Sequence, residues 1–539
     1  MEDRPSIEWW RGAVIYQVYP RSFQDTNGDG IGDLVGITQR LEHIASLGVD
    51  ALWISPFMKS PMLDYGYDVE DYRAVDPMFG SLSDFDYLLE KTHRLGLKLL
   101  VDLVPCHTSD RHAWFQEARQ SRDNAKADWY VFAEPNEDGT PPNNWLSVFG
   151  GVAWTFEPRR GQYYLHNFLP SQPQLNWHNP DVCAAMLAEA EFWLERGIDG
   201  FRVDAIDFAL HDPELRNNPV RPSNNAPVGG IVDGMPFARQ IHKGQRDHPD
   251  LPKSVLQPLK DLARSYGAFL LGEMSGDRAA ERLATYTDDG GLDAAYTFEL
   301  LRLGAEPKAI RNVIEDVERH IGGGWACFAQ SNHDVTRAVS RYGAHDQAAA
   351  WQPLITALLC SLRGTICLYQ GEELGLTEAD LAFEDLRDPY GISFFPAFKG
   401  RDGCRTPIPW SDGPTAGFTS GKPWLPVPVD HLEHSVDRQE CDLQSVLNRT
   451  RTFLHWRRAQ PALLTGDLQF LEAEAPILAM VRETVGQRLL CLFNLGAGPA
   501  TFEAPSEVKI IPESGFTTEI NGARVVLPPY GVFFGTLDR

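Results

Sequence analysis

One recurring unit constrains the fold of this chain most: a helix-like segment ends at a glycine, and a short apolar strand follows. Glycine is favoured just past the end of a helix, so each of these glycines marks a boundary between two elements. The segments with their glycines are 37–47 with Gly48, 85–95 with Gly96, 181–196 with Gly197 and 255–266 with Gly267. Alternating helices and wholly apolar strands are typical of a parallel sheet with helices packed outside it.

The apolar segments predict eight strands of this kind. They lie at 14–19, 51–55, 97–104, 200–206, 268–272, 294–298, 326–331 and 365–369. Eight parallel strands with intervening helices are expected to close into a (β/α)8 TIM barrel. A doubly wound open sheet is the alternative α/β fold, but no glycine-rich phosphate-binding turn follows any strand.

Two gaps in the pattern are far longer than a crossover needs, and they divide the chain into parts. Residues 107–174 are rich in Trp, Asn, Pro and Gly and are expected to form an inserted subdomain B after the third strand. The catalytic barrel would then comprise 1–106 and 175–462, with a long loop at about 377–436 after the eighth strand. In 463–539, short alternating strands such as 477–482 and 488–494 predict a C-terminal antiparallel β domain.

Composition limits the cellular compartments and the binding partners that suit this chain. The 539 residues carry a formal net charge of −25, which would repel phosphates and argues against a nucleic-acid partner. Residues 1–10 lack the apolar run of a signal peptide, and no run of about eighteen apolar residues occurs. The eight cysteines show no CxxC spacing and are expected to be reduced. We therefore expect a soluble cytoplasmic protein, monomeric or weakly dimeric, with no membrane partner and no organic cofactor.

A polar loop near the N-terminus resembles a calcium-binding loop in its spacing. Its oxygen donors at loop positions 1, 3, 5, 7 and 9 are Asp25, Asn27, Asp29, the backbone carbonyl of Ile31, and Asp33, with Gly30 at position 6. Position 12 is Gly36 rather than the usual Glu, and no flanking pair of EF-hand helices is evident. A polar turn without a metal is the alternative interpretation. We expect a structural Ca²⁺ or Mg²⁺ here.

Charged side chains interrupt the apolar strand 200–206. Arg202 and Asp204 would each be costly to bury alone, so they are expected to serve each other or a ligand. Taken alone, this stretch could be a structural ion pair. The other strand ends favour a functional interpretation.

Carboxylates and histidines follow several strands at the end where a TIM barrel places its active site. They are Asp102 and His107 after the third strand, Asp204 on the fourth, Glu273 on the fifth, and His333 and Asp334 on the seventh. Like charges gathered in one barrel mouth raise one another's pKa, so one acid can stay protonated beside an ionised neighbour. A nucleophilic and an acidic carboxylate are the groups that retaining glycoside hydrolysis uses.

The motifs around these residues resemble those of a known family. Five stretches resemble the conserved regions of the α-amylase superfamily (glycoside hydrolase family 13), namely DLVPCH at 102–107, QLNW at 174–177, GFRVDAID at 200–207, GEM at 272–274 and NHD at 332–334. Three others, DYGY at 64–67, YQGEE at 369–373 and GRDG at 400–403, resemble its branch of α-glucosidases and oligo-1,6-glucosidases. The resemblance covers nearly the whole chain.

The resemblance implies a role for each matching residue. Asp204 would be the nucleophile, Glu273 the general acid/base, and Asp334 a stabiliser of the transition state. The substrate-binding residues would be His107 and His333, which donate to sugar hydroxyls, Arg202, which keeps Asp204 ionised, Asp64 and Arg401, which clasp the non-reducing glucose, and Tyr67, which stacks beneath it. Phe149 and Phe168 would be aromatic walls contributed by the insertion, although a core position suits each of them equally well.

The implied activity is that of an exo-acting, retaining α-glucosidase on maltose and short malto-oligosaccharides, with transglucosylation when another acceptor reaches the site first. Ala205 follows the nucleophile, and in the family a small residue or Thr there goes with α-1,4 preference, whereas Val goes with α-1,6. An α-1,6-specific oligo-1,6-glucosidase and a trehalose or isomaltulose synthase-like isomerase are alternatives. A non-catalytic binding relative is a remote one.

Overall fold

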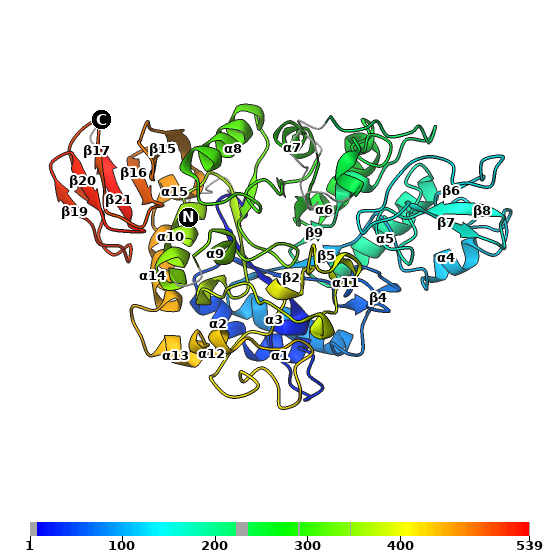
Figure 1. The fold of residues 1–539 in the computed structure, drawn as a ribbon, viewed down its shortest axis with the longest axis horizontal. Helices are drawn as coiled ribbons and strands as arrows, with labels where there is room; N and C mark the ends of the chain where they lie inside the picture. The colour runs from blue at the N-terminus through cyan, green and yellow to red at the C-terminus, as the bar shows by residue number, and fades with distance from the viewer. Residues whose placement is uncertain (1–7, 223–235, 277, 289–290, 345–346, 538–539) are drawn as a thin grey trace.

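The computed structural model describes residues 8–222, 236–276, 278–288, 291–344 and 347–537, and its centre is an eight-stranded parallel sheet (Figure 1). The strands are β1 (Val14–Val18), β2 (Ala51–Ile54), β5 (Lys98–Leu103), β9 (Gly200–Val203), β10 (Phe269–Glu273), β11 (Ala294–Tyr296), β12 (Cys327–Ala329) and β13 (Thr365–Tyr369). They pair in the order β11-β10-β9-β5-β2-β1-β13-β12, and a parallel bridge between Ala295 and Ala326 joins the two end strands. The predicted (β/α)8 barrel is confirmed.

Helices follow the strands and bury their apolar faces against the barrel. They are α1 (Leu34–Gln39), α2 (Leu41–Ser46), α3 (Leu82–Arg94), α5 (Pro180–Glu195), α6 (Gln257–Ser265), α7 (Ala279–Thr287), α8 (Pro307–His320), α9 (Ala338–Arg341) and α10 (Ala348–Leu359). Helix α3 illustrates how the sequence sets their limits: Ser81 and Asp84 form a capping box at its start, and Gly96 adopts φ 78° just beyond its end. Its Phe85 lies 4.9 Å from the ring of Trp193 in α5, which packs the two helices together.

Two predicted boundaries were wrong for identifiable reasons. The helix predicted at 37–47 is divided into α1 and α2 at Arg40, whose backbone leaves the helical region and whose guanidinium lies 4.1 Å over the ring of Trp410. The strand predicted at 200–206 ends at Val203, because Ala205 adopts φ 41° and turns the chain into a short 3₁₀ helix, Ile206–Phe208. Ile206 is fully buried, so its apolar character reflected burial rather than an extended backbone.

The segment after β5 forms a separate small sheet beside the barrel, on the right in Figure 1. It contains α4 (Ala113–Ala118) and the antiparallel strands β6 (Phe132–Ala133), β7 (Trp154–Glu157) and β8 (Gln162–Leu165). Its core is aromatic, since the ring of Phe115 lies 5.0 Å from Tyr130 and 5.1 Å from Tyr164. A shorter hairpin of β3 (Met58–Lys59) and β4 (Asp71–Val75) precedes it.

The chain ends in antiparallel strands, on the left in Figure 1. The strands are β14 (Asp467–Phe470), β15 (Ile477–Thr484), β16 (Gln487–Asn494), β17 (Ala500–Glu503), β18 (Val508–Ile510), β19 (Glu519–Asn521), β20 (Arg524–Leu527) and β21 (Val532–Leu537). They form a five-stranded and a three-stranded antiparallel sheet, which confirms the predicted C-terminal antiparallel β domain. The buried Arg482 of β15 joins these strands to the barrel, because its guanidinium donates to the backbone carbonyls of Ser361 (2.6 Å) and Leu362 (2.9 Å).

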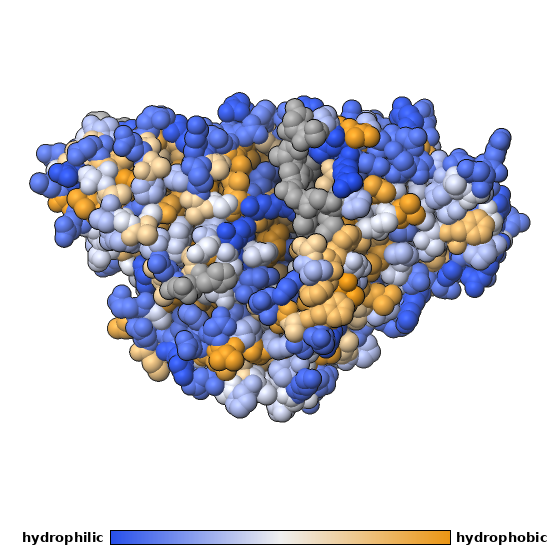
Figure 2. All heavy atoms as spheres, in the orientation of Figure 1, coloured by the Kyte–Doolittle hydropathy of each residue, from blue (hydrophilic) through white to orange (hydrophobic). Residues whose placement is uncertain are grey.

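The connection between β13 and these strands passes over the barrel. Its helices are α11 (Pro389–Phe394), α12 (Val429–Glu433), α13 (Val436–Glu440), α14 (Val446–Arg458) and α15 (Pro461–Thr465). The space-filling view has the same orientation as Figure 1, and in it the middle of the visible face is hollowed, with hydrophobic surface beside the hollow (Figure 2). Among the described residues, no helix has both the length and the apolar character that crossing a membrane requires.

Candidate active site

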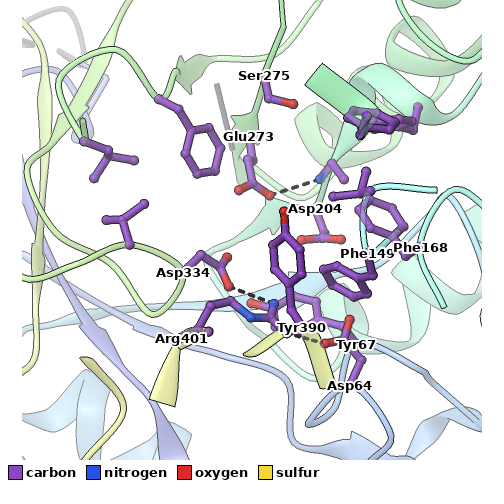
Figure 3. Close-up of a pocket in the computed structure, with 18 of the residues that line it drawn as sticks. Asp64, Tyr67, Phe149, Phe168, Asp204, Glu273, Ser275, Asp334, Tyr390 and Arg401 are labelled. Carbon is purple, nitrogen blue, oxygen red and sulfur yellow. Dashed lines mark hydrogen bonds and ion pairs between the residues drawn. The ribbon is translucent and has the colours of Figure 1, made fainter. Parts of the chain in front are cut away.

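A cavity of about 470 Å³ opens at the carboxyl ends of the barrel strands (Figure 3). Nine of the eleven residues proposed for catalysis and substrate binding line it: Asp64, Tyr67, His107, Phe149, Phe168, Asp204, Glu273, Asp334 and Arg401. The other two, Arg202 and His333, are fully buried beside it. Residues far apart in the sequence therefore meet in one pocket, because each follows a barrel strand or lies on a loop over the barrel mouth.

Arg202 organises the carboxylates of this pocket. Its guanidinium contacts Asp102 (2.7 Å) and Asp204 (2.6 Å) through Nη1, and Glu273 (2.5 Å) through Nη2. Nη2 also contacts the Tyr296 hydroxyl at 2.8 Å. Buried charge is tolerated only when it is paired in this way. The ion pair predicted at Arg202 and Asp204 thus exists, and it belongs to a larger network that holds two pocket carboxylates side by side.

The three pocket carboxylates differ in acidity. Burial raises the pKa of Glu273 to about 8 and that of Asp204 to about 7, and Arg202 opposes the shift in both. Burial acts in the same direction on Asp334, but the neighbouring positive charges, including Arg401, outweigh it and hold the pKa of Asp334 well below its usual value. Glu273 is therefore the carboxyl most ready to hold a proton, and Asp334 is the one most firmly ionised.

Arg401 closes one end of the pocket through a set of ion pairs. Its guanidinium contacts Asp64 (2.9 Å), Asp334 (3.1 Å) and Asp388 (2.8 Å). Asp64 accepts a further hydrogen bond from the Gln172 side chain at 3.0 Å. This end of the pocket is consequently charged, rigid and lined with groups that can bind sugar hydroxyls.

The two histidines occupy different positions relative to the cavity. His107 lines the cavity, donates from Nε2 to the Tyr67 carbonyl (2.9 Å), and has a pKa lowered to about 4 by burial. His333 lies behind Tyr67 instead of on the cavity surface: the two rings stack at 5.3 Å, and the His333 Nε2 contacts the Tyr67 hydroxyl at 2.7 Å. Its Nδ1 contacts the Gln17 amide at 2.7 Å. His333 therefore supports Tyr67 from behind.

The pocket joins expected aromatic residues with neighbours that the sequence analysis did not single out. Phe149 and Phe168, which could equally have been core residues, both line the cavity, and Phe149 packs 5.1 Å from Tyr390 of α11. Asp388 and Tyr390 belong to the long connection after β13, where no periodic pattern or known motif singles them out. Only their proximity to the motif around Arg401 could have drawn attention to them.

The N-terminal polar loop offers hard oxygen donors, and backbone amides hold it in a tight curl. Asp25 accepts from the amides of Asn27 and Gly28 at 2.9 Å, and Asn27 and Asp29 each accept from the amide two residues ahead at 2.8 Å. These oxygens suit Ca²⁺ or Mg²⁺. In the described part of the chain, no three His, Cys, Asp or Glu side chains gather as a metal site would need, so Asn27 and the Ile31 carbonyl would have to contribute. The metal stays a prediction.

Comparisons with known proteins agree with this geometry. The family model for the alpha-amylase catalytic domain matches residues 17–466. The chain is 52% identical to a probable alpha-glucosidase of Rhizobium meliloti (strain 1021), over 99% of this chain and 98% of that protein. It is 34% identical to an oligo-1,6-glucosidase of Parageobacillus thermoglucosidasius, over 93% and 92% of the two chains. The crystal structure of an alpha-glucosyl transfer enzyme, XgtA, superposes with a TM-score of 0.97 at 54% identity, covering 98% of this chain and 99% of that one. The chain is thus an enzyme of the alpha-amylase family of glycoside hydrolases.

Proposed function

We propose that this enzyme is a retaining, exo-acting α-glucosidase that removes the non-reducing terminal glucose from short α-1,4-linked substrates such as maltose. The observation that carries the proposal is the pair of pocket carboxylates, Asp204 and Glu273, which both contact the buried guanidinium of Arg202 beside the pocket. Retaining glycosidases place their two carboxyl groups ~5–5.5 Å apart, and inverting ones ~6.5–9.5 Å apart. Contact of both carboxylates with the same guanidinium supports the shorter arrangement.

The proposed mechanism is a double displacement. Glu273 donates its proton to the glycosidic oxygen while Asp204 attacks C1, which gives a β-glucosyl ester and releases the aglycone. Glu273 then accepts a proton from water as the water attacks C1, which breaks the ester and releases α-glucose. The acidity order supports these roles, since the pKa is about 8 for Glu273 and about 7 for Asp204.

The closed end of the pocket supports exo action. The Asp64–Arg401 ion pair, with its partner Asp388, would cap the bound glucose at this end of the pocket. A chain of glucose units could enter only with its non-reducing end first. Short substrates with a single terminal glucose in the pocket are therefore the substrates that this geometry favours.

The residue after the nucleophile supports a preference for α-1,4 linkages. Ala205 lines the cavity, adopts φ 41° and donates its backbone amide to Glu273 at 3.2 Å. A β-branched side chain would be strained at this backbone position, and its methyl groups would narrow the space beside Glu273. A methyl side chain leaves that space open, which supports α-1,4-linked substrates over the α-1,6-linked ones named for the oligo-1,6-glucosidase relative.

Product analysis on two substrates tests this proposal. Maltose and isomaltose are each incubated with the enzyme, and the anomers released are followed by NMR, with Asp204→Asn as the catalytic variant and Asp380→Asn, an exposed carboxylate, as the matched control. We expect α-glucose from maltose, a rate from isomaltose that is much lower, and loss of activity in Asp204→Asn alone. Release of β-glucose would refute retention, and activity on isomaltose only would refute the linkage preference.

A further inference from the structure

A second cavity, of about 520 Å³, lies next to the catalytic pocket. Its walls come from the connection between β9 and α6 and from the turn and helix α7 that follow β10. The two cavities share one lining residue, Arg246. Cavities of this volume are typical of sites that bind small molecules. We call this second cavity the basic cavity, because of the side chains that line it.

Positive charge predominates in the basic cavity. The described residues that line it include five basic side chains and two acidic ones, an excess of three positive charges: Arg221, Lys243, Arg246, Arg278 and Arg282 against Asp247 and Glu281. The chain as a whole carries a formal net charge of −25, so this cavity differs in sign from the rest of the molecule. A concave site lined by positive charge attracts and concentrates anions.

The two carboxylates neutralise only part of this charge. Glu281 pairs with Arg278. Asp247 contacts Arg282 and lies 3.7 Å from the Nε of Arg246.

Two of the basic side chains have donors that no described residue satisfies. The Nε of Arg282 is buried without a hydrogen-bond partner among the described residues. The side chain of Lys243 is exposed, and it makes no ion pair or hydrogen bond with any described residue. A buried donor without a partner is costly, so a ligand that accepts from it would be bound favourably. The basic cavity therefore has positively charged donors available for an anion.

A phosphate monoester is the anion that suits these donors. A guanidinium presents its N–H groups in a planar fork that matches phosphate oxygens, and a lysine adds a point charge. Near neutral pH a phosphate monoester carries roughly two negative charges, which would offset most of the excess positive charge. The cavity is much larger than an inorganic ion needs, and the Thr285 hydroxyl and the Asp247 carboxylate on its walls could bind hydroxyl groups. A polar body of the size of a sugar would therefore fit beside the phosphate.

Arg246 connects the basic cavity with the catalytic carboxylates. Its Nη2 contacts the Ser275 hydroxyl at 2.9 Å and the Asp207 carboxylate at 3.2 Å. The Ser275 amide donates to the same carboxylate at 3.2 Å. Ser275 comes two residues after Glu273, and the two are neighbours in Figure 3. Asp207 comes three residues after Asp204, so Arg246 bridges the segments that follow both catalytic carboxylates.

We propose that the basic cavity binds a phosphate monoester with a polar body of the size of a sugar, and that the bound ester slows the hydrolysis of glucosides. The binding site goes beyond the proposed function, and only the effect on hydrolysis rests on it. The phosphate oxygens would accept from Lys243, Arg282 and Arg246.

The effect on hydrolysis follows from the contacts of Arg246. Phosphate oxygens would compete with Asp207 and Ser275 for its guanidinium. The segments that follow the two catalytic carboxylates would then lose the bridge between them. Because this bridge does not touch the glucose, its loss should lower kcat with little change in KM.

Isothermal titration calorimetry tests the site. Glucose 6-phosphate is titrated into the enzyme at about pH 7.5 and constant ionic strength, with excess glucose in both solutions so that the catalytic pocket is already occupied. We expect one molecule bound per chain, at least about tenfold more tightly than inorganic phosphate, because the sugar body makes contacts that the ion lacks. No saturable binding would overturn the proposal, and equal affinity for inorganic phosphate would overturn its assignment to an ester.

Three substitutions locate the bound ester. Lys243→Gln should weaken binding about tenfold, because it removes a charge that has no described partner. Asp247→Asn should tighten binding about tenfold, because it removes a carboxylate that repels the phosphate, and misfolding cannot produce such a gain. Asn also tolerates the φ of 60° that Asp247 adopts. Lys253→Gln is the matched control at an exposed lysine that lines neither cavity, and it should leave the affinity unchanged.

Hydrolysis of 4-nitrophenyl α-glucoside then tests the effect on turnover. Saturating glucose 6-phosphate should lower the kcat of the wild-type enzyme about fivefold with little change in KM, and Lys243→Gln should need about tenfold more ester for the same effect. A rise in KM alone would place the ester in the catalytic pocket and overturn the proposal, as would unchanged affinities in both Lys243→Gln and Asp247→Asn. No hydrolysis in the absence of the ester would refute the proposed function, whereas calorimetry would still decide whether the site exists.

Discussion

Replacing Asp388 by Asn tests how the closed end of the pocket works. Asp388 is fully buried and accepts from Arg401 at three points: Nη2 at 2.8 Å, Nε at 3.0 Å and the backbone amide at 2.7 Å. Burial raises the pKa of Asp388, but Arg401 more than offsets this, so its pKa lies below the usual value. Hydrogen bonds to charged groups contribute ~1.5–3 kcal/mol, so losing the Asp388 carboxylate should lower the equilibrium constant for the bound position of Arg401 by roughly 10- to 100-fold.

The expected result is a rise in the KM for maltose of about 10- to 100-fold with a smaller fall in kcat. The reason is that the proposed contact of Arg401 with the terminal glucose exists both in the bound substrate and in the transition state. Steady-state kinetics measure the two constants, and thermal unfolding checks that the variant is folded. Asp380→Asn, which alters an exposed ion pair in the same connection, is expected to change neither. An unchanged KM with a lowered kcat would refute this account of the clamp.

Three further predictions concern acidity, linkage and metal. Because the pKa of Glu273 is raised to about 8, kcat/KM should fall as the pH rises through that value, where the general acid loses its proton. It should also fall below about pH 7, where the Asp204 nucleophile gains a proton. A flat profile between pH 5 and 9 would contradict these assignments. Ala205→Val should raise the ratio of isomaltose to maltose hydrolysis by about tenfold, measured as kcat/KM on each, and an unchanged ratio would count against the role of this position. If the loop at 25–33 binds the ion, chelation should lower the Tm and added Ca²⁺ should restore it; at a hundred times the Kd, the ion should add ~2.7 kcal/mol to the free energy of unfolding. A constant Tm, with no metal found by elemental analysis, would argue against the site.

The barrel could be predicted because its elements obey local rules. Helices that end at glycines such as Gly96, and strands that are apolar on both faces, leave a clear pattern in the sequence. The carboxylates at strand ends could be predicted for a related reason: a charge next to a buried strand is costly and therefore conspicuous. Asp204 and Glu273 were found in this way.

The rest depended on tertiary contacts that leave no local pattern. Tyr390 lines the pocket and Asp388 contacts Arg401 only because the connection after β13 folds across the barrel mouth. The position of His333 behind Tyr67 is set by stacking and by Gln17, which is more than three hundred residues away in the sequence. The turn at Ala205 also escaped prediction, because a positive φ at a non-glycine residue is held by its surroundings.

Trapping the glucosyl-enzyme tests the central claim most directly. Glu273→Gln is incubated with α-glucosyl fluoride, whose leaving group needs little acid assistance, and the intact protein and its peptides are analysed by mass spectrometry. We predict one added glucosyl group on the peptide that contains Asp204, and none in the double variant that also carries Asp204→Asn. An adduct on another residue, or fluoride release that yields β-glucose with no adduct, would contradict the assignment of Asp204 as the nucleophile.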